Sequence, residues 1–133
     1  MICEISFMNI QQPIKDKTLV IGASTNESRY SNLAIKRLKL FHHEIRALGL
    51  REGMVDGIPI IKEATIFEDV DTVTLYVGPD NQSAYYQYVI DLKPRRVIFN
   101  PGTENPNFYK LLDEAGIEHF EACTLVMLNT GQY

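Results

Sequence analysis

The stretch Lys17-Thr-Leu-Val-Ile-Gly-Ala-Ser-Thr-Asn-Glu-Ser-Arg-Tyr-Ser31 carries the strongest structural signal in this chain. Its apolar run ends at Gly22 and is followed by hydroxyl and amide side chains, an order typical of a strand, a phosphate-binding loop and a helix. A glycine there lets the backbone approach a phosphate, and unpaired amides at the start of the next helix favour an anion. A single glycine at such a turn is also common in parallel α/β domains that bind nothing there. The expected phosphate site comprises Gly22, Ala23, Ser24, Thr25 and Arg29.

The composition restricts both the architecture and the partners. With 133 residues, 45% of them hydrophobic, the chain is long enough for one substantial core and too short for two ordinary domains. The formal net charge of −4 argues against sequence-independent binding to nucleic acid. No apolar run reaches the length of a membrane span, and residues 1–8 lack the basic flank of a targeting signal. We therefore expect a cytoplasmic protein that binds neither nucleic acid nor a membrane, with Cys3 and Cys123 reduced.

Outward from residues 17–31, short β-branched runs alternate with helical stripes, which is the pattern of a parallel sheet covered by helices. The expected strands are 18–21, 44–48, 72–77, 96–99 and 118–122. The sequence thus predicts an α/β fold with a doubly wound, mainly parallel five-stranded sheet and helices on both faces. Residues 17–133 are expected to form this single domain, after an N-terminal extension of residues 1–16.

Helical periodicity predicts three main helices, at residues 31–42, 81–92 and 105–115. In the second, Tyr85 and Tyr88 fall on the apolar stripe and are expected to pack against the sheet. The third has the clearest signals, since Asn105 stands at the cap position, Pro106 in the first turn and Gly116 just past the end. Shorter elements are expected at 51–60 (edge strand or hairpin), 62–67 (helix) and 124–128 (helix).

The carboxyl ends of the predicted strands show a second pattern. In an open parallel sheet, ligands bind outside these ends, near the point where the strand order reverses. Four of the five ends carry a glycine, at positions 22, 49, 78 and 102. Because glycine and proline occur in turns of every kind, the functional interpretation rests on their convergence at one edge. The further candidates at this edge are Leu50, Arg51, Val77, Gly78, Pro79, Asn100, Pro101, Gly102 and Cys123.

The loop after the second predicted strand bears on the kind of nucleotide. An NAD site places Asp or Glu here to accept hydrogen bonds from the ribose hydroxyls, whereas this chain has Arg51. A cation suits a phosphorylated ribose, as in NADP or coenzyme A, and a solvated loop arginine is the alternative. The full Gly-x-Gly-x-x-Gly fingerprint is missing, because Ser24 and Glu27 stand where the later glycines would be. Classical dinucleotide binding is thereby disfavoured.

Taken together, these residues resemble a known family. The segment Val20-Ile-Gly-Ala-Ser24, with Arg29 and Ser31, the turns at 78–79 and 100–102 and the late Cys123, is similar to the small single-domain CoA-binding proteins. It is also similar to the nucleotide-binding first domain of the succinyl-CoA synthetase α chain. The resemblance covers residues 18 to 133 and implies a Rossmann-like sheet whose first loop holds the pyrophosphate of CoA. It further implies that the next two turns flank the adenosine and that the pantetheine arm runs toward the fourth-strand turn.

The chain departs from this family in two places. Many relatives have Asn-Pro where Gly49-Leu50 stands here, and Cys-Pro where Cys123-Thr124 stands. The first departure affects the expected adenosine pocket. The synthetase also needs a phosphorylatable histidine on a further domain, so synthetase activity of this chain alone is not expected.

Few residues offer catalytic chemistry. His42 and His43 would point about 100° apart on a helix and cannot chelate one metal together. His119 has no partner at triad spacing and is expected to face solvent. Cys123 is expected near the crevice, where the start of a following helix would make its thiol reactive, and a small buried hydrophobe is the alternative. We therefore expect no catalytic residue and no metal site.

Three hypotheses follow from the sequence. The first is a non-catalytic module that binds coenzyme A or acyl-CoA as a sensor or carrier and presents it to a protein partner. The second is a minimal NADP-binding oxidoreductase, although no segment supplies an acid or base for a substrate. The third is an interaction protein that has lost its ligand, as the departure at Gly49-Leu50 would permit.

Overall fold

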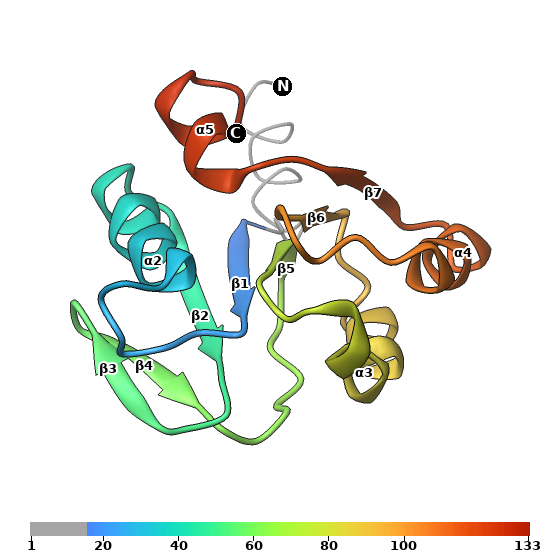
Figure 1. The fold of residues 1–133 in the computed structure, drawn as a ribbon, viewed down its shortest axis with the longest axis horizontal. Coiled ribbons are helices and arrows are strands. Elements are labelled where there is room, and N and C mark those ends of the chain that lie inside the picture. Colours follow the sequence, from blue (N-terminus) through green and yellow to red (C-terminus); the bar gives the residue numbers. More distant parts are fainter. Residues whose placement is uncertain (1–15) are drawn as a thin grey trace, which may run out of the picture.

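A seven-stranded sheet forms the centre of the protein in the computed structural model, which describes residues 16–133 (Figure 1). The strands are β1 (Lys17–Ile21), β2 (Glu44–Leu48), β3 (Gly53–Val55), β4 (Ile58–Ile61), β5 (Val70–Leu75), β6 (Arg96–Phe99) and β7 (Glu118–Glu121). Their order is β3-β4-β2-β1-β5-β6-β7, and all neighbours are parallel except β3 and β4. The chain passes from β1 to β2 on one side and later returns to β5 on the other, so the strand order reverses at β1. The expected Rossmann-like α/β class is confirmed, while the expected N-terminal extension, apart from Asp16, lies outside the described residues.

The expected count of five strands was too low because the hairpin joins the main sheet. Strands β3 and β4 pair antiparallel around Asp56 and Gly57, whose φ angles are +48° and +83°. Asp-Gly with both φ angles positive is typical of the tight type I′ hairpin turn. Strand β4 then pairs in parallel with β2 through Ala47 and Leu48, which extends the sheet on that side.

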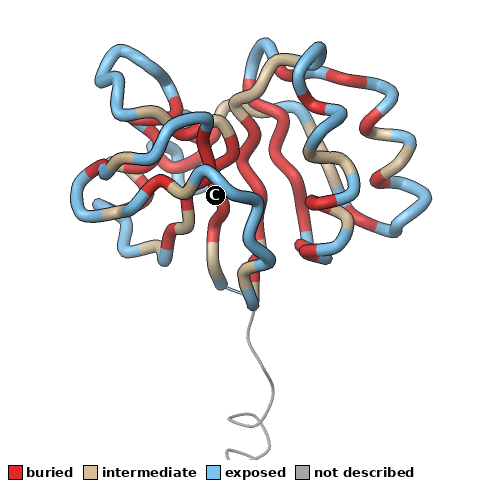
Figure 2. The backbone as a smooth tube through the Cα atoms, turned by 90° about the horizontal axis from the view of Figure 1, so that it is seen from below, coloured by how far each residue is buried: buried red, intermediate tan, exposed pale blue. Residues whose placement is uncertain are grey.

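Helices cover both faces of the sheet, as expected. Helices α2 (Tyr30–Leu40) and α5 (Thr124–Asn129) pack together on one face, and α3 (Tyr86–Leu92) and α4 (Pro106–Glu114) on the other (Figure 1). Figure 2 shows the strands buried between these layers. The apolar side chains form two clusters, one containing Ile35, Leu38 and Leu128 and the other containing Val89 and Phe108. No helix in residues 16–133 has the length and apolar character needed to cross a membrane.

Helix α4 shows how the local sequence sets a helix boundary. The Asn105 side chain accepts hydrogen bonds from the backbone amides of Asn107 and Phe108, which satisfies donors left open at the first turn. At the other end Gly116 has φ +72°, a left-handed conformation that favours glycine after a helix. The predicted cap, first-turn proline and terminating glycine are all confirmed.

Two predicted helices differ from the structure. The segment expected as a helix at 81–92 starts as two 3₁₀ turns, Pro79–Asn81 and Ser83–Tyr85, before α3 begins. Between them the buried Gln82 side chain donates to the carbonyls of Val77 and Thr103, which holds the segment in this conformation. Residues 62–67 form no helix: most of them are exposed, so they lack the buried apolar face that a six-residue helix needs.

Candidate functional site

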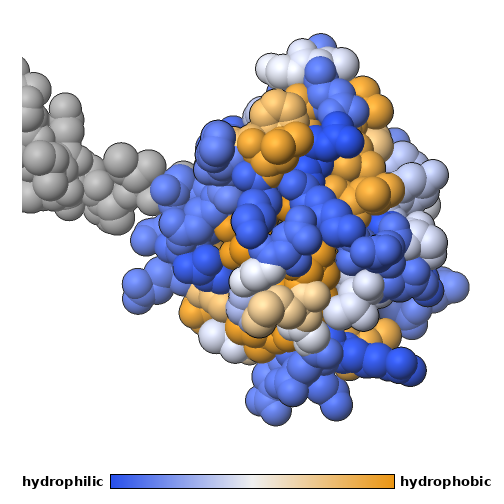
Figure 3. All heavy atoms as spheres, turned by 90° about the vertical axis from the view of Figure 1, so that its left-hand side faces the viewer, coloured by the Kyte–Doolittle hydropathy of each residue, from blue (hydrophilic) through white to orange (hydrophobic). Residues whose placement is uncertain are grey.

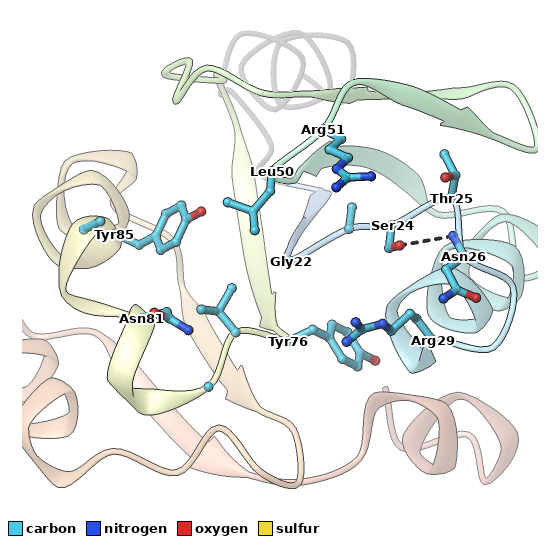
Figure 4. A pocket seen from close by; sticks show the side chains of 14 residues that line it. Gly22, Ser24, Thr25, Asn26, Arg29, Leu50, Arg51, Tyr76, Asn81 and Tyr85 are labelled. Atoms are coloured by element: carbon cyan, nitrogen blue, oxygen red, sulfur yellow. Dashed lines mark hydrogen bonds between the residues drawn. The ribbon is translucent and has the colours of Figure 1, made fainter.

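A cleft with a volume of about 820 Å³ opens at the carboxyl ends of β1, β2 and β5. Its walls are the loop after β1, the loop between β2 and β3, and the segment after β5 (Figure 4). These three loops meet at β1, where the strand order reverses, and ligands of open α/β sheets bind at this position. The cleft also falls in the size range of small-molecule sites, about 300–1,000 Å³.

Gly22 brings the first loop close to the neighbouring strand. Its φ is +94°, and a Cβ atom there would lie 3.0 Å from the backbone carbon of Tyr76. The amides of Gly22 and Ala23 both donate to the carbonyl of Leu48, at 2.9 and 3.0 Å. These two amides are therefore occupied by the fold, and Gly22 serves to turn the chain tightly rather than to present its own amide.

Side chains shape the rest of this loop from within. The Asn26 amide donates to Ser24 Oγ at 3.1 Å, and the Ser28 amide and hydroxyl both donate to Asn26 Oδ1. Among the described residues, the amides of Ser24, Thr25 and Glu27 have no hydrogen-bond partner. Unpaired amides at the start of a helix are suited to an anion.

A buried amide side chain supports the loop from below. Asn32, on the first turn of α2, is 1% exposed, and its Nδ2 donates to the Ser24 carbonyl at 2.9 Å. Its Oδ1 is buried and has no partner among the described residues. Asn32 thus holds the carbonyl of Ser24 in place, next to the amides that have no partner.

Two arginines give the cleft a positive charge. Figure 4 places Arg29, at the start of α2, and Arg51, in the β2–β3 loop, on either side of Ser24. Both are exposed, and neither has an ion-pair partner among the described residues. No Asp or Glu lines the cleft, although the whole chain has a net charge of −4. The cleft is therefore a locally cationic site on an acidic protein.

The opposite side of the cleft is apolar. Leu50 is 82% exposed, an unusual state for a large aliphatic side chain, and it points toward Tyr85 across the cleft (Figure 4). Val77, Asn81 and Ala84 also line the cleft. An exposed leucine opposite an aromatic ring forms a slot suited to a flat, partly apolar group.

Comparison with known proteins then assigns the chain to a family. Residues 16–129 match the family described as the CoA binding domain. The chain belongs to this family. A solved structure described only as an uncharacterized protein is 48% identical, with 92% of this chain and 100% of that chain covered and a TM-score of 0.86. The resemblance inferred from Val20–Ser24 and the later turns is thus confirmed.

More distant structures share the fold of this CoA-binding domain. A cell-free-expressed protein from Thermus thermophilus is 20% identical, with 98% of each chain covered and a TM-score of 0.80. A hypothetical protein from Pyrococcus horikoshii is 22% identical, with 97% of this chain and 91% of that chain covered and a TM-score of 0.77. No protein of curated function matches the chain significantly.

The structure brings many of the predicted site residues of the CoA-binding domain together in the cleft. Those that line it are Gly22, Ala23, Ser24, Thr25, Arg29, Leu50, Arg51, Val77 and Gly78. Pro79 follows directly and begins the first 3₁₀ turn. Ser31 lies outside the lining, buried in α2 on the side that faces the core.

The predicted residues after β6 and β7 do not line the cleft. Asn100 is 2% exposed, and its side chain joins three elements: Nδ2 donates to Thr74 Oγ1 and the Leu75 carbonyl, and Oδ1 accepts from the Thr124 amide. Pro101 and Gly102 form an exposed turn. Cys123 is a free, partly buried thiol at the position before α5. The turn signal after β6 therefore has a structural explanation in Asn100.

Sequence reasoning did not select several residues of the lining. The residues that line the cleft without having been predicted are Asn26, Tyr76, Asn81, Ala84 and Tyr85. Tyr85 was assigned to packing, and it does pack against the core cluster that contains Val89. Tyr85 lies in the second 3₁₀ turn, on the segment between β5 and α3. The signal that could have found it was its place on the segment that follows this strand.

The histidines lie outside the cleft lining. His119 was expected to face solvent, which is wrong: its side chain is 17% exposed, its Nε2 lies 2.7 Å from Asp113 Oδ1, and its ring stacks on Tyr109. His43 packs edge-on against the ring of Tyr133. Within residues 16–133, no group of three or more His, Cys, Asp or Glu side chains is arranged to hold a metal.

Proposed function

We propose that this protein binds coenzyme A or acyl-CoA without transforming it, as a sensor or as a carrier that presents the ligand to another protein. The observation that carries the proposal is the cleft itself, which combines two unpaired arginines and free loop amides with an apolar slot. Membership of the CoA-binding domain family supports this choice of ligand.

The chemistry of the cleft fits the nucleotide part of CoA group by group. The free amides of Ser24, Thr25 and Glu27, with Arg29, would hold the pyrophosphate. Arg51 would hold the phosphate on the ribose, since it stands on the other side of Ser24 (Figure 4). The slot between Leu50 and Tyr85 would take the adenine ring, which covers an otherwise exposed leucine.

The lining supports binding rather than catalysis. Its ionisable side chains are Arg29, Arg51, Tyr76 and Tyr85. Burial raises the pKa of Tyr76 to about 12, so its hydroxyl stays protonated at neutral pH. General acid–base catalysis most often uses His, Asp or Glu, and none of the described residues that line the cleft is of these types.

Two alternative functions would use the cleft or a different surface. NADP also carries a phosphate on its ribose, so Arg51 and the free amides would suit it as well. The ligand-free interaction protein would use exposed apolar residues such as Leu33 and Leu40 on α2. In Figure 3, hydrophobic side chains on the face around α2 and the β3–β4 hairpin are interspersed with hydrophilic ones. Such interspersed residues are common on soluble proteins and do not by themselves mark an interface.

A calorimetric titration with CoA, dephospho-CoA and NADP distinguishes these functions. The protein is first unfolded and refolded to remove any ligand that co-purifies. Saturable binding of CoA, with weaker binding of dephospho-CoA, is the expected result. Binding of NADP alone would favour the oxidoreductase, and binding of none of the three would contradict a nucleotide-binding function.

A further inference from the structure

Tyr76 forms one end of the cleft. It directly follows β5, and its amide donates to the Ile21 carbonyl at 2.8 Å, which fixes its backbone beside the first loop. Its ring lines the cleft near Arg29 (Figure 4) and also packs against the apolar cluster on the α2 side of the sheet. The ring thus has one side on the cleft and the other on the protein interior.

The Tyr76 hydroxyl is buried and makes no hydrogen bond with the described residues. Its nearest polar neighbours, the hydroxyls of Thr74 and Thr124, are already joined to each other at 2.8 Å, and Thr74 also accepts from Asn100. Burial is the main cause that raises the Tyr76 pKa; these two hydroxyls oppose the rise, and nearby Cys123 adds to it. The hydroxyl therefore reaches a group of polar atoms without being paired to any of them.

Behind the ring lies a set of groups that could bind a polar chain. Thr74, Thr124 and Cys123 come from β5 and from the start of α5, and they gather around the end of the Tyr76 side chain. The cleft lining includes Tyr76 and none of these three residues, so the Tyr76 side chain has the cleft on one side and this group on the other.

We propose that Tyr76 is a gate: a ligand arm extending from the phosphate groups displaces the Tyr76 ring and reaches Thr74, Thr124 and Cys123. The inference rests on the proposed function, and it names the binding path of the thiol-bearing arm of CoA. Turning the ring costs little hydrogen bonding, because its hydroxyl lies near the Thr74 and Thr124 hydroxyls without meeting the geometry of a hydrogen bond to either. The arm in turn supplies amide and carbonyl groups that can pair with the hydroxyls behind the ring.

Gly78 gives the backbone after the gate room to adjust. A Cβ atom at Gly78 would meet no heavy atom within 4 Å, so the space beside Gly78 is open. Val77 lies between Gly78 and Tyr76 in the sequence, and all three residues line the cleft. The Tyr76 backbone is packed against Gly22, so the proposed motion is a turn of the Tyr76 side chain.

The test measures whether a ligand arm shields Cys123. A Cys3→Ser background leaves Cys123 as the single thiol, and bromobimane labels it with and without ligand. Desulfo-CoA carries the whole arm without a competing thiol, and adenosine 3′,5′-bisphosphate lacks the arm. At ten times the Kd of each ligand, desulfo-CoA should slow labelling by roughly tenfold, because about nine-tenths of the protein is then bound. Adenosine 3′,5′-bisphosphate should leave the rate unchanged.

Binding without shielding would overturn the gate while leaving the proposed function in place. Absence of binding by both ligands in calorimetry would overturn both. Both measurements use protein with the native Tyr76, so the comparison does not depend on a substitution in the core.

Two variants separate the ring from its hydroxyl. Tyr76→Ala should speed labelling of Cys123 in the free protein and strengthen desulfo-CoA binding by roughly threefold or more, because the ligand no longer has to move a ring. Tyr76→Phe keeps the ring and should behave as the wild type in both measurements. Equal behaviour of the two variants would contradict gating.

Discussion

Gly53 and Thr25 touch across the two loops that form the cationic side of the cleft. A Cβ atom at Gly53 would lie 2.5 Å from Thr25 Cγ2, closer than side chains tolerate. Gly49, at the other end of the β2–β3 loop, is similarly close to the first loop, since a Cβ there would lie 2.3 Å from the Ala23 carbonyl oxygen. Glycine at both ends therefore lets the Arg51 loop pack directly against the phosphate loop.

This contact predicts a paired effect of substitutions at the two positions. Gly53→Ala should lower the free energy of unfolding by about 1–2 kcal/mol, because Thr25 must move to admit the methyl group. Adding Thr25→Ser removes the Cγ2 atom and should restore most of the loss. Chemical denaturation of the two single variants and the double variant measures the coupling. Gly78→Ala is the control, since its Cβ would meet nothing; additive effects at 53 and 25 would contradict the contact.

The two cleft arginines should act on different parts of the ligand. Arg29→Gln should weaken CoA and dephospho-CoA alike by roughly 10- to 100-fold, because both carry the pyrophosphate. Arg51→Gln should weaken CoA by a similar factor and leave dephospho-CoA nearly unchanged. Lys110→Gln, at an exposed position on α4, is the matched control in calorimetry. Identical loss of both ligands in the two variants would contradict the assignment of the two sites.

Two tyrosine hydroxyls should differ in their effect on stability. Tyr88 donates from its hydroxyl to the Thr65 carbonyl at 2.6 Å, whereas the Tyr76 hydroxyl has no partner among the described residues. Tyr88→Phe should therefore cost about 1 kcal/mol of unfolding free energy, and Tyr76→Phe should cost almost nothing. Thermal or urea unfolding of both variants provides the comparison. A larger loss in Tyr76→Phe than in Tyr88→Phe would mean that the Tyr76 hydroxyl is paired after all.

Acid should destabilise the protein partly through Asp71. Burial acts to raise the pKa of this carboxyl, but hydrogen bonds from Arg95 and Thr72 and the charges of Arg95 and Arg96 outweigh it, so the net pKa is lowered. Arg95 binds both carboxylate oxygens, at 2.8 and 3.0 Å. A carboxyl with a lowered folded pKa stabilises the fold above its unfolded pKa of about 3.9 and loses that contribution as pH falls through its folded pKa.

Unfolding midpoints measured from pH 7 down to pH 2 test this contribution. The wild type should lose stability below about pH 4. Asp71→Asn should be less stable than the wild type at neutral pH and show a flatter decline in acid. Asp91→Asn is the control, because its carboxylate is exposed and, within residues 16–133, accepts a hydrogen bond only from the neutral Gln87 amide. Parallel pH curves for Asp71→Asn and the wild type would rule out the Asp71 contribution.

Local sequence signals predicted an element well where the atoms that stabilise it lie within a few residues of one another. The cap at Asn105 and the glycine at 116 work through atoms within a few residues, so their roles could be inferred without the fold. Residues 62–67 failed because a short helix depends on burial, which a local pattern does not report. The hairpin was expected, but its addition to the main sheet depends on pairing between β4 and β2.

The residues of the candidate site also fall into those that local sequence features predicted and those that only the fold revealed. The first loop, Arg51 and the turn at Val77 and Gly78 were identified because glycines and polar residues at strand ends are local features. Asn100 carries the same kind of turn signal, yet its amide is used to tie β5 to the start of α5. Tyr76 was missed because an aromatic residue at a strand end is usually part of the core. Its position on the cleft becomes clear only from the residues around it in the folded protein.

The sequence by itself determined the α/β class, the phosphate-loop pattern at Gly22 and the cationic character of the loop at Arg51, because these depend on residue type and spacing along one segment. The tertiary structure decided which strand ends share a cleft, which amides remain free and where the Tyr76 ring stands. Those properties depend on atoms far apart in the chain: Leu48 occupies the amides of Gly22 and Ala23, and Thr74 and Thr124 pair with each other and leave the Tyr76 hydroxyl alone. Strand order and side-chain competition for hydrogen bonds set these relationships, and neither is contained in a local pattern.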